Sequence, residues 1–307
     1  MKVAVVGFGI QGRKRAAVAG DDVACIVDPI APQATCKSIE DVPLNSYEGA
    51  LVCTPDDAKF GILSFLLSHG KHVLVEKPLL EDRSRILTLK SLAAENRVTC
   101  YTAYNHRFEP NLVRLRQLLA EGKIGEVYQA RFFYGNGTAM DVKRSAWRDK
   151  GMGVLPDLGS HLLDTCLFLF GSFDHDFRPW AFNRFENNAY DRFVCGSTGS
   201  PAIELEMSLL SWRNTFTVDI HGELGSLHVH GLCKWGPSIL TIRERVMPSG
   251  RPPEKTFQIE SPDPTWEAEY RHFLSASQRG ESNLDNDLWI HSVLTRLEQW
   301  IPAGVRA

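Results

Sequence analysis

Three side chains, those of Lys77, Asp157 and His161, could together transfer a proton and stabilise a developing charge. Lys77 follows the apolar run 72–75, so we expect it at the carboxyl edge of a parallel strand, where open α/β sheets bind ligands. Its ammonium group has three donors, and its charge would stabilise negative charge on an alcohol or ketone oxygen. Asp157 and His161 begin an amphipathic segment, 157–170, and their spacing would place both on one face of a helix.

Each of these residues has a chemical role and a simpler alternative. His161 is a natural general base because the ordinary pKa of imidazole is about 6.5, and the alternative is a buried core histidine. Asp157 would orient the imidazole or bind a substrate hydroxyl, and the alternative is a helix cap. The alternative for Lys77 is a surface lysine at a strand end. We expect no metal at Asp157, His161 and Asp164, since this segment has no second histidine at ligand spacing.

A glycine-rich pattern lies near the start of the chain, between a short apolar strand and a helix. Gly7 would permit a tight turn, Gly9 would let a pyrophosphate approach the backbone, and Gly12 would let helix and strand pack closely. The N–H groups at the start of the helix would bind the phosphates. The predicted nucleotide-binding loop consists of Gly7, Phe8, Gly9, Ile10, Gln11 and Gly12. A plain glycine turn is the alternative, and the flanking strand and helix favour the nucleotide.

The choice between NAD and NADP depends on the charges near the adenosine ribose. Asp28 ends the second predicted strand, and its carboxylate would bind the ribose hydroxyls and repel a 2′-phosphate, which favours NAD. Arg13, Lys14 and Arg15 keep NADP as an alternative, because a nearby cation would bind that phosphate. Further cofactor contacts are predicted at the strand ends and loops that follow: Thr54, Pro55, Glu76, Lys77 and Asn105.

Strand-like and helix-like segments alternate through the N-terminal third of the chain. The predicted strands are 2–6, 23–28, 51–54, 72–75 and 98–104. Helical periodicity appears at 58–68 and 85–96. Nearly continuous apolar strands that alternate with helices predict a doubly wound parallel sheet, the Rossmann arrangement, covered on both faces.

The pattern changes after about residue 120, where longer segments alternate apolar and polar residues. Strands are predicted at 127–134, 202–210, 215–221, 226–230 and 239–245, and helices at 266–278 and 284–300. This alternation suits an antiparallel sheet with one solvated or subunit-facing side. The predicted fold is therefore α/β, with an NAD-binding Rossmann domain over 1–119 and a substrate-binding α+β domain with an open-faced, mostly antiparallel sheet over 120–307.

The composition is that of an ordinary globular protein, with 43% hydrophobic and 23% charged residues. A formal net charge of -3 argues against nucleic-acid binding. No apolar stretch approaches the roughly 20 residues that span a bilayer, and the first residues do not resemble a secretion signal. Seven widely spaced cysteines without a Cys-x-x-Cys pair favour neither a disulfide scaffold nor a zinc ribbon. We therefore expect a cytoplasmic protein.

Four motifs resemble those of the glucose-fructose oxidoreductase / inositol dehydrogenase (Gfo/Idh/MocA) family. They are Glu76-Lys77-Pro78, the Tyr-Asn-His-Arg-Phe run 104–108, the segment 151–161 with its Asp-x-x-x-His spacing, and the turn 221–227. The resemblance implies that Lys77, Asp157 and His161 are catalytic, with His161 as the base. It also implies that the open sheet makes subunit contacts in a homodimer or homotetramer. Two positions depart from the family pattern: Lys59 stands where histidine is frequent, and Gly151-Met152-Gly153 replaces a triple glycine.

These residues predict an NAD(P)-dependent oxidoreductase that transfers a hydride between nicotinamide and a secondary hydroxyl or ketone of a sugar, cyclic polyol or sugar nucleotide. The alternatives are a redox-neutral sugar-modifying enzyme that uses NAD transiently and a non-catalytic NAD(P)-binding regulator. Arg144, Trp147 and Arg148 are predicted to contact a sugar nucleotide, with the cations at its diphosphate. A solvated charged loop is the alternative for this segment.

Overall fold

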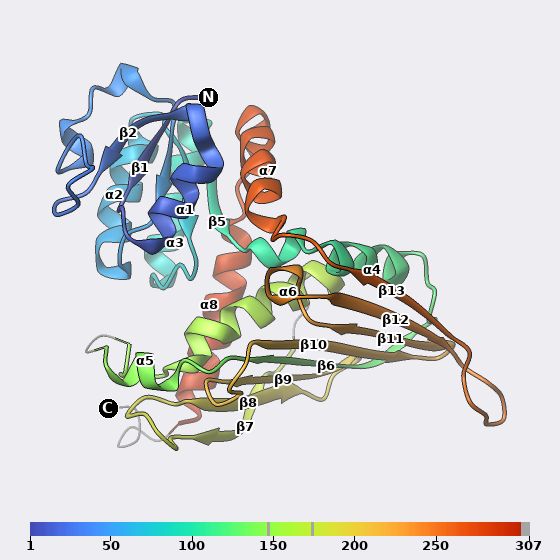
Figure 1. Ribbon diagram of the computed structural model, residues 1–307. Helices are drawn as coiled ribbons and strands as arrows, with labels where there is room; N and C mark the ends of the chain where they lie inside the picture. Colours follow the sequence, from blue (N-terminus) through green and yellow to red (C-terminus); the bar gives the residue numbers. More distant parts are fainter. Residues whose placement is uncertain (146–147, 173–174, 302–307) are drawn as a thin grey trace. The chain divides into compact units, whose positions relative to one another are not determined.

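The protein is described by a computed structural model that covers residues 1–145, 148–172 and 175–301 (Figure 1). Its internal contacts divide the chain into two units. The first unit contains Met1–Asn105 and Thr265–His291, and the second contains His106–Pro264 and the chain from Ser292 onward. The domains expected from the sequence, an NAD-binding domain over 1–119 and a substrate-binding domain over 120–307, stay a prediction.

The first unit contains a five-stranded parallel sheet with the strand order β2-β1-β3-β4-β5. The strands are β1 (Val3–Val6), β2 (Val23–Val27), β3 (Gly49–Val52), β4 (His72–Glu76) and β5 (Cys100–Ala103). Every residue of β1, β3 and β5 is buried, because a parallel sheet of this kind is covered on both faces. The parallel sheet predicted from the sequence is confirmed.

Helices lie on both faces of this sheet. They are α1 (Ile10–Ala19), α2 (Asp56–Ser68), α3 (Arg83–Glu95), α7 (Thr265–Arg279) and the first part of α8 (Leu284–Gln299). Alternate residues of β1 point to opposite faces. Ala4 packs in a core with residues of α2 and α3, whereas Val5 packs in a second core with Tyr270 and Phe273 of α7. The sheet is thus doubly wound as expected, and a helix from near the end of the sequence completes one of its two cores.

The second unit contains an eight-stranded sheet with the order β13-β12-β11-β10-β6-β9-β8-β7. The strands are β6 (Val127–Gly135), β7 (Arg178–Asn183), β8 (Arg192–Ser197), β9 (Ala202–Ser208), β10 (Thr215–Gly222), β11 (Gly225–His230), β12 (Ser238–Glu244) and β13 (Glu254–Ile259). Only the β6–β9 pair among these neighbours is parallel. The mostly antiparallel sheet predicted for this part of the chain is confirmed.

The two faces of this sheet differ in polarity. In β9, Ile203, Leu205 and Met207 are buried, while Glu204 and Glu206 lie on the other face. The helices α4 (Pro110–Ala120) and α6 (Ser160–Phe170) contact strands of the sheet (Figure 1). The opposite face has charged side chains, and both glutamates of β9 form ion pairs with an arginine of β6.

The sequence pattern did not predict β7, β8 and β13. β7 and β13 are the two edge strands of the sheet. β13 reads Glu-Lys-Thr-Phe-Gln-Ile, a run without a continuous apolar face, and its pairing with β12 depends on backbone hydrogen bonds. Edge strands are often polar because one side of them faces solvent, so hydrophobic periodicity is a weak signal for them.

Candidate active site

The predicted site residues are distributed over the two units, which are described in turn. In the first unit, the glycine loop connects β1 with α1. Gly7 has φ of 88°, and a Cβ atom on it would lie 2.7 Å from the carbonyl oxygen of Cys53. A Cβ on Gly12 would lie 1.9 Å from the carbonyl oxygen of Gly7, so helix and strand pack too closely there for any side chain. A Cβ on Gly9 would have no neighbour within 4 Å, and α1 starts at the next residue. This cradle fits a dinucleotide pyrophosphate, which would lie beside Gly9 at the start of the helix.

The Asp28 carboxylate is fixed at the end of β2. It accepts hydrogen bonds from the backbone N–H groups of Phe8 (2.7 Å), Ile30 (2.9 Å) and Ala31 (2.8 Å). The Phe8 N–H is the largest of the causes that hold the pKa of Asp28 below its usual range, so the group is ionised at neutral pH. A carboxylate has about four acceptor positions, which leaves capacity for a ribose hydroxyl. The charge and position of Asp28 therefore fit the adenosine ribose of NAD.

The three cations of α1 have different surroundings. Arg15 is buried, donates to Glu76 through Nε (2.7 Å), and forms an ion pair with Glu269 through Nη2 (2.7 Å). Burial disfavours its charge, but the two carboxylates raise the pKa of Arg15 above its ordinary value. Arg13 and Lys14 are exposed. Of the three, Arg15 is thus committed to an internal ion cluster, and the two exposed cations remain as candidates for a 2′-phosphate.

Lys77 follows β4 at the carboxyl edge of the sheet and is partly buried. Its bond to Pro78 is cis. β3 is the neighbour of β4, so Thr54 and Pro55, which follow β3 and precede α2, lie at the same edge. The predicted neighbours of the cofactor are therefore brought to one edge of the sheet, as the carboxyl ends of parallel strands require. Glu76 bonds with Arg15 at this edge, and its predicted contact with the cofactor stays a prediction.

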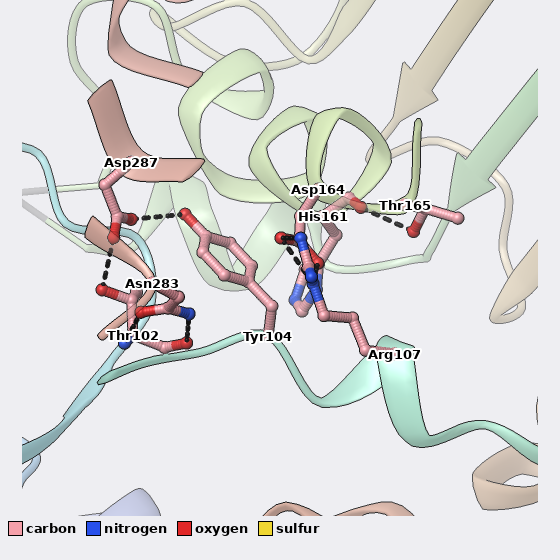
Figure 2. A network of polar contacts seen from close by, with 8 residues as sticks. All are labelled: Thr102, Tyr104, Arg107, His161, Asp164, Thr165, Asn283 and Asp287. Atoms are coloured by element: carbon pink, nitrogen blue, oxygen red, sulfur yellow. Dashed lines mark hydrogen bonds and ion pairs between the residues drawn. The ribbon is translucent and has the colours of Figure 1, made fainter. Parts of the chain in front are cut away.

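The end of β5 is tied to α7 and α8 within the first unit. Asn105, a predicted cofactor contact, is buried and donates from Nδ2 to Oγ1 of Thr265 (2.8 Å). Asp287 of α8 accepts from the hydroxyls of Thr102 (2.8 Å) and Tyr104 (3.2 Å), as Figure 2 shows. These contacts connect residues more than 150 positions apart in the chain, and they fix the strand end where Asn105 lies. The cofactor role of Asn105 itself stays a prediction.

In the second unit, Asp157 and His161 lie on successive helical turns. Asp157 belongs to a π-helical turn, Leu155–Gly159, which continues directly into α6. π-helical turns are rare in proteins, and those that occur are often at functional sites. The preceding loop bends at Gly153, which has φ of 51°, and a Cβ there would lie 2.3 Å from the carbonyl oxygen of Tyr190. The helix predicted to begin at Asp157 therefore begins two residues earlier, at Leu155, and Asp157 is not its N-cap.

Asp157 and His161 differ in burial and in partners. His161 is 6% exposed, whereas the side chain of Asp157 is 37% exposed. Nη2 of Arg148 lies 3.3 Å from Oδ2 of Asp157, so one of the predicted substrate-binding cations contacts the predicted orienting carboxylate. Arg144, just after the short helix α5 (Ala139–Lys143), is exposed. Trp147 lies outside the described residues.

The rings of His106 and Tyr134 lie against His161, and neither residue was predicted as a site residue from the sequence. The His106 ring stacks on His161, with centroids 4.2 Å apart and planes at 17°. The Tyr134 ring of β6 lies edge-on at 5.8 Å. Burial raises the pKa of Tyr134 well above its ordinary value, and the charge of Asp157 raises it further. Nζ of Lys234 lies 3.1 Å from Nε2 of His106. In the sequence, this cluster was indicated by the position of His106 within the 104–108 motif. Ring contacts between distant segments leave no periodic pattern that could predict them.

A buried ion pair lies one turn beyond His161. Arg107 contacts both carboxylate oxygens of Asp164, from Nε at 2.9 and 2.8 Å and from Nη2 at 2.7 Å (Figure 2). Burial raises the pKa of Asp164, and the guanidinium charge of Arg107 opposes that shift. Asp164 is thus engaged by an arginine. Within the described ranges, no group of three or more His, Cys, Asp or Glu side chains is arranged to hold a metal ion.

Two family models match this chain. The model described as "Oxidoreductase family, NAD-binding Rossmann fold" matches residues 1–104. The model described as "GFO/IDH/MocA C-terminal domain" matches residues 112–228. Together they cover most of both units, and each corresponds to the sheet that the structure contains there.

Curated relatives align with about two fifths of this chain. An uncharacterised oxidoreductase, YdgJ, of Escherichia coli (strain K12) is 35% identical over 124 residues, which are 39% of this chain and 35% of that protein. The scyllo-inositol 2-dehydrogenase (NADP(+)) IolW of Bacillus subtilis (strain 168) is 32% identical over 129 residues, 41% of this chain and 36% of that protein. The alignments therefore span about a third of these relatives' own lengths.

A similarity of fold extends over nearly the whole chain. The solved structure of UDP-N-acetylglucosamine 3-dehydrogenase from Acidithiobacillus ferrooxidans superposes with a TM-score of 0.79 and 19% identity, over 99% of each chain. At this identity the comparison concerns the fold alone. No helix in the described part of the chain is long and apolar enough to cross a membrane.

Proposed function

Because the chain belongs to the Gfo/Idh/MocA family of oxidoreductases, we propose that it transfers a hydride between NAD and a secondary hydroxyl or ketone of a carbohydrate. The proposal rests on one observation: this chain contains each group that the proposed reaction uses. The groups are the nucleotide loop 7–12, the ionised Asp28, Lys77, and the Asp157/His161 turn. A regulator that only sensed the nucleotide would need the loop 7–12 and Asp28, but it would not need a general base.

The proposed roles follow from the chemistry of each group. A bound nicotinamide supplies the hydride acceptor or donor. Lys77 donates to the oxygen at the reacting carbon and stabilises its negative charge. His161 takes the hydroxyl proton during oxidation and returns it during reduction. Asp157 orients the imidazole or binds a neighbouring substrate hydroxyl.

The preference for NAD depends on Asp28. Its carboxylate is held by three backbone N–H groups, so it cannot move away from an incoming 2′-phosphate without breaking them. The exposed Arg13 and Lys14 keep NADP as the second choice. NADP-dependent relatives exist, as the name of the scyllo-inositol enzyme indicates.

For the substrate we propose a sugar, a cyclic polyol or a sugar nucleotide. By their names, the relatives above act on an inositol and on UDP-N-acetylglucosamine. Arg148 beside Asp157 would place a cation near the reacting group and would contact a diphosphate. Arg148→Ala should raise KM for sugar nucleotides and leave KM for uncharged polyols unchanged. Equal KM values for every substrate would contradict the diphosphate contact.

The proposed reaction is tested with purified protein, NAD or NADP, and a panel of polyols, sugars and UDP-sugars. Stoichiometric change in the absorbance of reduced nicotinamide supports the dehydrogenase. Product without net nicotinamide change would indicate a redox-neutral enzyme, and nucleotide binding without product would indicate a regulator. Lys77→Ala should lower kcat by roughly 10²–10³-fold, the usual cost of one oxyanion donor. The control is Lys71→Ala, at the other end of β4, which should retain turnover.

The second unit is also the proposed place of subunit contacts. The charged face of its sheet would pair with a second copy in a homodimer or homotetramer. Light scattering coupled to gel filtration measures the mass of the assembly directly, and a monomer at all concentrations would contradict this expectation.

A further inference from the structure

Lys59 is a buried lysine in α2, and its ammonium group is saturated with partners. The residue is 2% exposed. Nζ lies 2.8 Å from the carbonyl oxygen of Glu76, 2.7 Å from the carbonyl oxygen of Pro78, and 2.6 Å from Oδ1 of Asp56. An ammonium group has three donors, and three acceptors surround it here. A lysine is almost never fully buried unless it is paired, so such a site needs a reason.

The two carbonyl groups stand on either side of Lys77 in the chain. β4 ends at Glu76, where the ladder with β5 also ends. Lys77 and Pro78 follow the last residue of β4 and lie beyond the last pair of this ladder. Nζ of Lys59 lies within hydrogen-bond distance of both carbonyl oxygens and so holds the peptide groups on either side of Lys77. The backbone that carries Lys77 is therefore fixed by the side chain of another lysine.

Charge balance at this site has a consequence for Lys77. Nζ of Lys59 lies next to the peptide groups on either side of Lys77, and a second ammonium group there would repel that of Lys77 if it were uncompensated. Asp56 forms an ion pair with Lys59 within the same helix, three positions earlier. Together, Lys59 and Asp56 add no net charge beside the backbone of Lys77.

We propose that Lys59 is a positioning residue for Lys77, which acts by holding the Glu76 and Pro78 carbonyls and touches neither cofactor nor substrate. This inference rests on the proposed function, in which Lys77 polarises the substrate oxygen. Misplacement of a catalytic group by about 1 Å costs roughly 10²-fold in rate. Lys59→Met keeps the aliphatic length and removes the donors, so it should lower kcat by up to this factor with little change in KM.

The chain contains a matched control. Lys71 also donates from Nζ to two backbone carbonyls, those of Leu44 (2.6 Å) and Tyr47 (2.9 Å), but it precedes β4. Lys71→Met removes a comparable pair of bonds away from the carboxyl edge. Both variants should lose thermal stability, while NAD affinity, measured by calorimetric titration, should stay within about twofold of the wild type. Only Lys59→Met should lower kcat. Equal kcat values in the two variants would overturn the proposal.

A double-mutant cycle separates positioning from general structural damage. If Lys59 acts through Lys77, Lys59→Met should cause almost no further loss of kcat in a Lys77→Ala background, because the group that it positions is gone. Multiplicative losses would contradict the inference. Full turnover by Lys77→Ala, or no nicotinamide-dependent turnover by the wild type, would instead refute the proposed function. A normal Lys77 effect with no specific Lys59 effect refutes the positioning role alone.

Discussion

The imidazole rings of His106 and His161 are stacked, with their centroids 4.2 Å apart and their planes at 17°. His106 comes from the 3₁₀ turn Asn105–Phe108 that follows β5, and His161 comes from the first turn of α6. Nζ of Lys234 lies 3.1 Å from Nε2 of His106, and an ammonium group donates only, so this nitrogen accepts the hydrogen bond. His106 is thereby fixed as a flat surface against the proposed base.

Replacement of His106 should reduce activity through the orientation of His161. An aromatic pair contributes about 0.5–1.5 kcal/mol beyond its buried area. His106→Ala should therefore lower kcat/KM by up to about tenfold, whereas His106→Phe, which keeps a flat ring, should retain most of the activity. Steady-state kinetics of both variants check this. Equal losses in both would show that the ring surface is not what matters.

Asp28 should control both nucleotide choice and acid stability. Asp28→Asn removes a charge-assisted acceptor, a type of bond that contributes about 1.5–3 kcal/mol, so NAD affinity should fall roughly 10–100-fold. NADP affinity should fall much less, because the repulsion of its 2′-phosphate is also removed. Calorimetric titrations with both nucleotides measure the ratio, and an unchanged ratio would exclude Asp28 from the ribose site.

The pH dependence of stability at Asp28 has a definite sign. Its pKa is lowered in the folded protein, chiefly by the Phe8 N–H group. The resulting stabilisation is present above the ordinary aspartate pKa of about 3.9 and is lost as the pH falls through the lowered value. The difference in thermal midpoint between wild type and Asp28→Asn should therefore narrow below about pH 4. Thermal scans from neutral pH to acid test this, and a constant difference would contradict it.

The glycine loop allows folding and nucleotide binding to be separated. A Cβ on Gly12 would overlap the carbonyl oxygen of Gly7, so Gly12→Ala should lower stability by about 1–3 kcal/mol, as overpacking does. A Cβ on Gly9 has no neighbour within 4 Å, so Gly9→Ala should keep the thermal midpoint of the nucleotide-free protein. It should nevertheless weaken NAD binding, because the added methyl group would occupy space beside the pyrophosphate. Wild-type NAD affinity in Gly9→Ala would refute that placement.

Removal of one partner of the Arg107–Asp164 pair should destabilise the protein strongly, whereas replacement of both by apolar residues should destabilise it little. Arg107→Met leaves a buried carboxylate without its guanidinium and should destabilise by about 3–5 kcal/mol at neutral pH. The pKa of Asp164 is already raised by burial, so protonation is favoured as the pH falls, and the loss should shrink in acid. Urea unfolding of Arg107→Met and of Arg107→Met/Asp164→Leu measures both effects. The double variant should be close to wild type, and a loss as large as in the single variant would contradict this account.

Hydrophobic periodicity and local motifs were sufficient to predict the central elements of the fold. Apolar runs such as 72–75 predict buried parallel strands because both faces of that sheet are covered, and the glycine pattern predicts the loop because only glycine fits at Gly7 and Gly12. The alternation in Ile203, Leu205 and Met207 predicts a strand with one buried face. These are properties of short segments, and the local conformation of the backbone follows from them directly.

Partnerships between distant segments required the tertiary structure. The sequence identified Glu76, Lys59 and Arg15 as charges, but not that Arg15 would form ion pairs with Glu76 and Glu269 or that Lys59 would hold the carbonyls beside Lys77. The order of the strands brings Arg15 and Glu76, which are 61 positions apart in the chain, to one edge of the sheet. The contacts of Lys59 with the carbonyls of Glu76 and Pro78 span 17 and 19 positions. The same holds for α7, whose amphipathic pattern specifies a helix but not the core that it covers. A buried charge leaves no periodic signal, since its position is set by the partner that compensates for its desolvation.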